Sequence, residues 1–193
     1  MSDRSLLVRL LAQRSVRWGR FTLASGRESN HYVDARLTTM SPEGLAIIGP
    51  LALDSIRQHG WTADAVGGLT LGADPIAYAI AMASVASPPL VRAFTVRKEA
   101  KQHGTGRLIE GPMRDSDRVV VIEDVITTGG SALRAAEAIQ RTGATISGIL
   151  ALVDREEGGR AVLEAQGFSV ICLATLSELL DQAPAGDAAA HAS

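Results

Sequence analysis

The chain has 193 residues, of which 46% are hydrophobic and 21% are charged, and its formal net charge is -2. This composition is typical of a folded globular domain and excludes a disordered or fibrous protein. Because 19 lysines and arginines are outnumbered by 21 acidic residues, we expect no nucleic-acid partner, and a phosphate-bearing ligand would need a local site. No stretch approaches the roughly 18 apolar residues that a membrane-spanning helix needs, so we expect a cytoplasmic protein without a membrane partner.

A small N-terminal hood is predicted over about residues 1–40. A first helix is expected near the start, where apolar side chains repeat at helical spacing. These side chains are Leu6, Leu7, Leu10 and Leu11. Two short extended segments follow at 20–23 and 31–34, and Ser25-Gly26-Arg27 lies between them, which predicts an antiparallel hairpin.

The rest of the chain is predicted to form an α/β core from about residue 41. Ser41 as cap and Pro42 in the first turn predict a helix that ends at Gly60. Strand-like runs follow at 63–66, 91–96, 119–122, 146–153 and 168–173, and helical patterns lie near 75–85, 131–141 and 160–165. This alternation predicts a mainly parallel twisted sheet flanked by helices, in one domain over residues 1–182. We expect residues 183–193 to be a disordered tail.

The segment from 119 to 131 carries the most informative pattern. A strand leads to two adjacent acids, Glu123 and Asp124, and then through a turn rich in threonine and glycine into a helix. Such a turn presents backbone N–H groups and hydroxyls to a phosphate dianion. The acids would repel that phosphate, so they are better suited to accept hydrogen bonds from vicinal sugar hydroxyls beside it. The pattern predicts a site for ribose 5-phosphate, and the alternative is a capped turn with solvated acids.

This segment resembles the motif with which type I phosphoribosyltransferases bind phosphoribosyl diphosphate (PRPP). Other glycine-rich nucleotide signatures fit poorly, because the turn has neither a Gly-Lys-Ser/Thr ending nor the pattern G-x-G-x-x-G. The resemblance implies the type I phosphoribosyltransferase fold and a set of PRPP-binding residues. These are Glu123, Asp124, Val125, Ile126, Thr127, Thr128, Gly129, Gly130 and Ser131.

A polar, basic run follows the strand that ends at Val96. It holds Arg97, Lys98, Lys101 and His103 among glycines, so it could close over a diphosphate and neutralise its charge as it leaves. A solvated surface loop is the alternative. The spacing Arg-Lys-x-x-Lys-x-His-Gly resembles the catalytic loop of orotate phosphoribosyltransferases. That resemblance implies PRPP binding by all four residues, catalysis by Lys101 and His103, and a homodimer whose subunits exchange this loop.

Arg155 follows the strand at 146–153 and could bind the carboxylate or a ring carbonyl of an anionic base, although a surface ion pair is the alternative. In orotate phosphoribosyltransferases an arginine at this place contacts orotate together with the first threonine of the phosphate loop, which implies orotate binding by Arg155 and Thr127. Two positions depart from the family. Lysines found in many bacterial members are replaced by Ala24 and by a lysine-free turn at 67–74.

The resemblance as a whole implies the transfer of ribose 5-phosphate from PRPP to orotate, which gives orotidine 5′-monophosphate and diphosphate in de novo pyrimidine biosynthesis. Mg²⁺ is the implied cofactor, bound mainly through PRPP and not by a dedicated set of protein ligands. Two alternatives stay open. The first is a salvage phosphoribosyltransferase for another base, and the second is a PRPP-binding regulator without catalysis, which would need a DNA-binding segment or a basic face.

Overall fold

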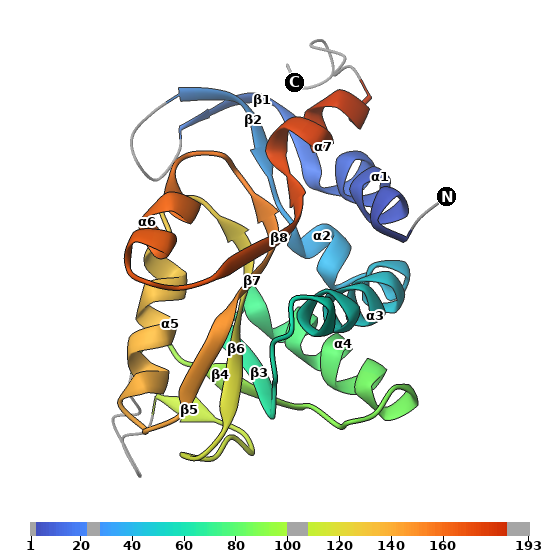
Figure 1. The fold of residues 1–193 in the computed structure, drawn as a ribbon. Helices are drawn as coiled ribbons and strands as arrows, with labels where there is room; N and C mark the ends of the chain where they lie inside the picture. The colour runs from blue at the N-terminus through green and yellow to red at the C-terminus, as the bar shows by residue number, and fades with distance from the viewer. Residues whose placement is uncertain (1–2, 23–27, 100–107, 185–193) are drawn as a thin grey trace.

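The computed structural model describes residues 3–22, 28–99 and 108–184 and shows an α/β fold with a six-stranded sheet (Figure 1). The sheet contains β3 (Ala65–Leu69), β4 (Arg92–Val96), β5 (Ile109–Glu110), β6 (Arg118–Ile126), β7 (Thr145–Asp154) and β8 (Val170–Thr175). Its strand order is β5-β4-β3-β6-β7-β8, and all neighbours pair in parallel except β4 and β5. The predicted fold class is confirmed. The strand β5 was not predicted.

Helices cover both faces of this sheet (Figure 1). One face packs against α1 (Asp3–Ser15), α3 (Pro42–Gln58), α4 (Ala73–Ala86) and α7 (Leu176–Gln182), and the other against α5 (Gly130–Gln140) and α6 (Gly159–Ala165). A hydrophobic core lies on each face of the sheet, and alternate residues of β6 point into the two cores. Val120 and Ile122 pack in the core under α1, α3, α4 and α7, and Val119 and Val121 pack in the core under α5 and α6. Because β6 is buried on both faces of the sheet, its apolar residues form a continuous run. No helix in the described part of the chain is long and apolar enough to cross a membrane.

The hood consists of α1 and an antiparallel pair, β1 (Val16–Thr22) and β2 (Glu28–Val33), joined through residues outside the described ranges. The predicted hairpin is confirmed. The predicted apolar face of α1 is wrong in part, because Leu7 and Leu11 are buried but Leu6 is 41% exposed. Val8 is buried instead, since the helix packs between α3 and α7 and turns the face that contains Leu7, Val8 and Leu11 toward them.

The helix predicted to start after Ser41 is α3. The Ser41 hydroxyl accepts a hydrogen bond from the Gly44 amide at 3.1 Å, and Pro42 is the first helical residue, as predicted. Two short helices were not predicted. They are α2 (Arg36–Thr39) and α7, which begins with a capping box formed by Thr175 and Glu178.

Strand β6 is longer than predicted, and this changes the setting of the two acids. It continues to Ile126, so Glu123 and Asp124 lie within the strand and not after it. Its pairing with β3 ends at Val121, whereas its pairing with β7 continues to Ile126. The last residues of β6 therefore have a strand partner on the β7 side alone within the described residues, and their other side is open to a cleft.

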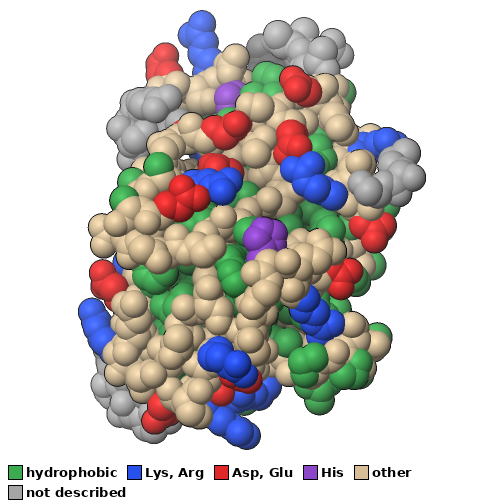
Figure 2. Space-filling model, in the orientation of Figure 1, with side chains coloured by type: hydrophobic (Ala, Val, Ile, Leu, Met, Phe, Trp, Pro, Cys, Tyr) green, Lys and Arg blue, Asp and Glu red, His purple; other side chains and the backbone are tan. Residues whose placement is uncertain are grey.

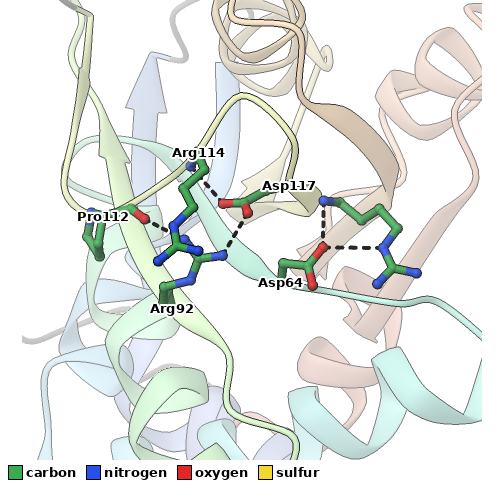
Figure 3. A network of polar contacts seen from close by, with 6 residues as sticks. Asp64, Arg92, Pro112, Arg114 and Asp117 are labelled. Carbon is green, nitrogen blue, oxygen red and sulfur yellow. Dashed lines mark hydrogen bonds and ion pairs between the residues drawn. The ribbon is translucent and has the colours of Figure 1, made fainter.

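The amino ends of β3, β4 and β6 are tied together by ion pairs (Figure 3). Asp117, which is buried, accepts hydrogen bonds from Arg92 Nη2 and from the Arg114 amide, each at 2.7 Å. Asp64 accepts a hydrogen bond from Arg118 Nε at 3.2 Å. These pairs close one end of the sheet, and the carboxyl ends of the strands are left to form the ligand site.

Candidate active site

A cleft of about 680 Å³ opens at the carboxyl ends of β3, β6 and β7. It is lined by residues from the hood, from the turn after β3, from the end of β6 and from the segment after β7. These residues are Thr22, Tyr32, Val33, Asp34, Ala35, Arg36, Leu69, Thr70, Leu71, Gly72, Lys98, Glu123, Asp124, Val125, Thr127, Ser131 and Arg155. A smaller cavity of about 90 Å³ shares four of these residues and is otherwise lined by Ile126, Thr128, Gly129, Gly130 and Arg134.

The smaller cavity is a cradle formed by the turn from residue 127 to residue 131. Gly129, with φ of 82°, adopts the left-handed conformation that favours glycine and precedes α5. The Thr127 carbonyl accepts a hydrogen bond from the Gly159 amide at 3.0 Å, which fixes the turn. The first turn of α5 leaves backbone N–H groups without helical partners, and Arg134 adds a positive charge from the same helix. The cradle is suited to a phosphate dianion.

Glu123 and Asp124 connect the cradle to the main cleft. Glu123 is 8% exposed, and its Oε2 has no hydrogen-bond partner within the described residues. Burial, and next the charge of Asp124, raise the pKa of the Glu123 carboxyl well above its usual value. Asp124 accepts a hydrogen bond from the Val125 amide at 2.9 Å. A buried carboxyl oxygen without a partner can be satisfied by a ligand hydroxyl.

The turn after β3 forms the opposite wall. Asp74 is buried and accepts hydrogen bonds from the hydroxyls of Thr70 at 2.7 Å and Thr95 at 2.8 Å. These contacts hold the turn against β4. Leu71 and Gly72 line the cleft in the middle of this turn.

Arg155 lines the cleft and lies near His31 on the hood strand β2. Its side chain is 7% exposed and Nη2 contacts Glu157 Oε1 at 2.8 Å, whereas Nε has no partner within the described residues. Partial burial and next the charge of Arg155 lower the pKa of His31 on β2. Arg155 therefore forms a buried ion pair and not the surface pair considered as an alternative, and it keeps one N–H group for a ligand.

The residues of the basic run are placed differently from one another. Lys98 lines the main cleft. Arg97 lines neither of the two cavities described above; its Nη1 lies 3.8 Å from Glu110 Oε1, and its Nε donates to the Glu99 carbonyl at 3.3 Å. Lys101 and His103 fall outside the described residues. All predicted residues from Glu123 to Ser131, together with Arg155, line one or both cavities.

Three charged residues of the site were not predicted. Asp34 and Arg36 come from the hood and α2, and Arg134 comes from the second turn of α5. The position of Arg134 could have been inferred, because a residue three places after Ser131 on a helix lies on the same face. The sequence pair Asp34 and Arg36 gave no such signal, since only the folding of the hood over the sheet brings it to the cleft.

Comparison with known proteins places the chain among phosphoribosyltransferases. The phosphoribosyl transferase domain family matches residues 39–172. The orotate phosphoribosyltransferase of Aquifex aeolicus is 46% identical over 183 residues, which cover 93% of this chain and 99% of that protein. The crystal structure of Mycobacterium tuberculosis orotate phosphoribosyltransferase in complex with Fe(III) dicitrate is similar, with a TM-score of 0.82, 44% identity and coverage of 92% of this chain and 99% of that one. A structure of the same enzyme in complex with PRPP has a TM-score of 0.75 and 36% identity, and covers 92% of this chain and 91% of that one.

Proposed function

This chain belongs to the phosphoribosyl transferase family and, within it, to the orotate phosphoribosyltransferases, and from that membership we propose how its cleft divides between the substrates. The reaction transfers ribose 5-phosphate from PRPP to orotate, gives orotidine 5′-monophosphate and diphosphate, and serves pyrimidine biosynthesis. The observation that carries the proposal is the continuity of the phosphate cradle, the acidic pair and Arg155 along one cleft.

We assign the sugar phosphate of PRPP to the cradle and the acids. The 5-phosphate occupies the turn at 127–131, where backbone N–H groups and hydroxyls converge. The ribose hydroxyls then reach Glu123 and Asp124, and a hydroxyl that donates to Glu123 Oε2 gives this buried oxygen the partner that it otherwise lacks. A sugar phosphate can therefore contact both the phosphate cradle and the acidic pair.

We assign orotate to the end of the cleft that holds Arg155. The orotate carboxylate is a planar anion, and a guanidinium donates two hydrogen bonds in a matching plane. Thr127 lines the same cleft and can donate its hydroxyl to the base. Since Arg155 Nε has no partner within the described residues, a carboxylate here replaces an unfavourable buried donor with a charge-assisted bond.

Catalysis rests on stabilising charge rather than on a protein nucleophile. A ring nitrogen of orotate forms a bond to the anomeric carbon while the bond from that carbon to the diphosphate oxygen breaks, and the proton of the ring nitrogen passes to the departing diphosphate or to water. Positive charge therefore grows on the ribose ring and negative charge on the diphosphate. We propose that Lys101 and His103 assist the departing diphosphate and that Arg97 and Lys98 help to bind PRPP. Lys98 already lines the cleft, which supports its part in this proposal.

Mg²⁺ is proposed to enter with PRPP. Within the described residues no group of three or more His, Cys, Asp or Glu side chains could hold a metal ion. Mg²⁺ is commonly held by one or two carboxylates together with substrate phosphate oxygens, and Asp124 offers such a carboxylate inside the cleft. When bound, the ion neutralises diphosphate charge. A cytoplasmic location also stays a prediction.

The proposed homodimer is supported by an apolar surface on α4. Tyr78, Met82 and Val85 form one stripe of this helix and are 55%, 74% and 65% exposed, and Leu90 just beyond it is 67% exposed. The sequence has no charged residue from 75 to 91. Figure 2 shows hydrophobic side chains gathered at the lower right, over the end of α4 and the segment after it. Such a stripe can pack on its own copy about a two-fold axis.

This surface lies next to the strand that leads into the basic run. The Tyr78 hydroxyl is 3.1 Å from the Thr95 hydroxyl on β4, and β4 ends directly before Arg97. A partner packed on α4 is therefore near the start of the run, which supports a loop shared between subunits. Met82→Glu should convert a dimer to a monomer in light scattering, whereas Val162→Glu, on the exposed face of α6, should not. A dimeric Met82→Glu protein would place the interface elsewhere.

The activity is tested by incubating the protein with PRPP, Mg²⁺ and a panel of bases. Product should form with orotate and not with uracil or adenine, and Asp124→Asn should weaken PRPP binding in calorimetry without loss of the fold. Transfer to another base in preference to orotate would support a salvage enzyme. PRPP binding without transfer to any base would support a regulator.

A further inference from the structure

Several cationic side chains line the cleft and the phosphate cradle at separate places. One of them, Arg36, has no role in the assignments above. Arg134 belongs to the phosphate cradle and Arg155 to the orotate end, whereas Arg36 projects from α2 on the hood side. We propose that Arg36 binds the diphosphate group of PRPP and that Asp34 is the positioning residue that orients it. This inference rests on the proposed function and adds a residue for the leaving group.

Arg36 is held in a fixed orientation by Asp34. Arg36 Nε donates to Asp34 Oδ1 at 2.8 Å and Nη2 donates to Asp34 Oδ2 at 3.0 Å, while the Arg36 amide donates to Oδ1 at 3.2 Å. A two-point contact between a guanidinium and a carboxylate sets the plane of both groups. These contacts use Nε and Nη2 and not Nη1, and the Arg36 side chain remains 49% exposed. The Nη1 group of Arg36 therefore has a fixed orientation and can donate hydrogen bonds to an anion.

The charge of Arg36 acts on the part of the cleft around Asp124. Its ion pair with Asp34 is the main cause that raises the pKa of Arg36, and the charge of Asp124 contributes further. Gly72 lies directly against the Asp124 carboxyl, and both Leu71 and Gly72 line the cleft with Arg36. Arg36 and Leu71 also line the shallow groove next to it. These contacts bring Arg36, the turn after β3 and Asp124 to one region.

The geometry of displacement at the anomeric carbon assigns the region around Arg36, Leu71 and Gly72 to the diphosphate. With the 5-phosphate in the cradle and the ribose at Glu123 and Asp124, the anomeric carbon has two faces, one for the attacking base and the other for the departing group. Arg155 marks the face of the base. The diphosphate therefore leaves on the side of Leu71, Gly72 and Arg36.

Electrostatics requires a donor on that side. Glu123 and Asp124 would repel a polyanion that lay beside them without a counter-charge. Arg155 is assigned to the base, and Arg97 lies near Glu110 and does not line the cleft. Lys98 and Arg36 both line it, and of these two Arg36 has a guanidinium oriented by Asp34. Because Asp34 offsets part of its charge, Arg36 is expected to act mainly through directed hydrogen bonds.

The test compares Arg36→Gln and Arg36→Lys with Arg17→Gln. Arg17 is a matched control, since it is an exposed arginine of the hood whose charge also acts on Asp34, but it does not line the cleft. Calorimetry with Mg²⁺ and inorganic diphosphate should show about 10-fold weaker binding or more for Arg36→Gln, partial recovery for Arg36→Lys, and no change for Arg17→Gln. Binding of ribose 5-phosphate should change less than about 2-fold in all three.

The same variants separate a binding role from a structural one. Asp34→Asn should weaken diphosphate binding less than Arg36→Gln, because Arg36 keeps its charge but loses its orientation. Unchanged diphosphate affinity in Arg36→Gln would overturn the inference, and so would an equal loss of diphosphate and ribose 5-phosphate binding. Both measurements are made without a base, so a failure to transfer ribose to orotate would reject the proposed function alone.

Discussion

Gly72 lies so close to Asp124 that a Cβ atom at position 72 would stand 2.5 Å from the Cγ atom of the Asp124 carboxyl. The backbone at Gly72 is helical, with φ of -58° and ψ of -44°, which any residue adopts easily. The requirement for glycine at this position therefore comes from the approach of the carboxylate and not from the backbone.

Gly72→Ala is expected to weaken PRPP binding on the order of 10-fold while the melting temperature stays the same or rises slightly. The added methyl group displaces the Asp124 carboxyl from the ribose site, whereas alanine in a helical conformation lowers the entropy of the unfolded chain. Calorimetry with PRPP and thermal unfolding measure the two effects. Unchanged affinity would mean that the Asp124 carboxyl serves the ligand from another position.

Glu123→Gln is expected to raise the melting temperature and to weaken PRPP binding. Burial and the charge of Asp124 raise the folded-state pKa of Glu123, so the folded protein holds a proton that the unfolded chain releases. The carboxyl therefore lowers stability at a pH above its unfolded pKa, and the penalty grows until the pH passes the folded pKa. Thermal unfolding should show a larger gain at about pH 8 than at about pH 4. A gain that does not depend on pH would contradict this ionisation.

The network in Figure 3 allows a comparison of a buried acid, Asp117, with a partly exposed one, Asp64. Asp117→Ala should lower the free energy of unfolding by about 3 kcal/mol, because it leaves Arg92 and the Arg114 amide without their shared acceptor. Asp64→Ala removes a pair whose Asp64 side chain is 35% exposed, and should lower it by less than about 1 kcal/mol. Urea unfolding measures both. Equal losses would show that burial does not set the strength of these pairs.

The sequence predicted those features that depend on neighbouring residues. The cap at Ser41, the helix after it and the turn at 127–131 are set by local patterns, and the structure confirms each of these elements. The alternation of strands and helices predicted the mainly parallel sheet for the same reason, because each unit has its own hydrophobic period.

Features that depend on distant pairing were missed. Strand β6 continues through Glu123 to Ile126 because β7 is long enough to pair with it, whereas the two adjacent acids within β6 favoured an earlier end of the strand. Arg36 reaches the cleft only because the hood folds over the sheet, so its role could not be read from its neighbours.

Arg155→Ala is expected to raise the Michaelis constant for orotate by about 10-fold or more, with a smaller change for PRPP. The side chain lines the cleft near His31 on β2, and in the proposed division of the cleft it contacts the base and not the sugar phosphate. Glu157→Gln is the control, since it removes the ion pair at 2.8 Å but keeps the guanidinium. Steady-state kinetics with each substrate varied in turn would oppose the assignment if both constants rose equally.

Lys101→Ala is expected to lower the turnover number by on the order of 100-fold or more with a smaller change in PRPP affinity, because charge on the diphosphate grows only as the glycosidic bond breaks. Lys101 lies outside the described residues, so this expectation comes from the sequence. If the loop acts on the neighbouring subunit, a mixed dimer of Lys101→Ala and Asp124→Asn subunits has one site in which an intact loop meets an intact Asp124, and another with both defects. Co-expression in equal amounts should then restore about a quarter of the wild-type activity, since half of the dimers are mixed and each has one working site. Mixed dimers shown to form but without recovered activity would mean that each loop serves its own subunit.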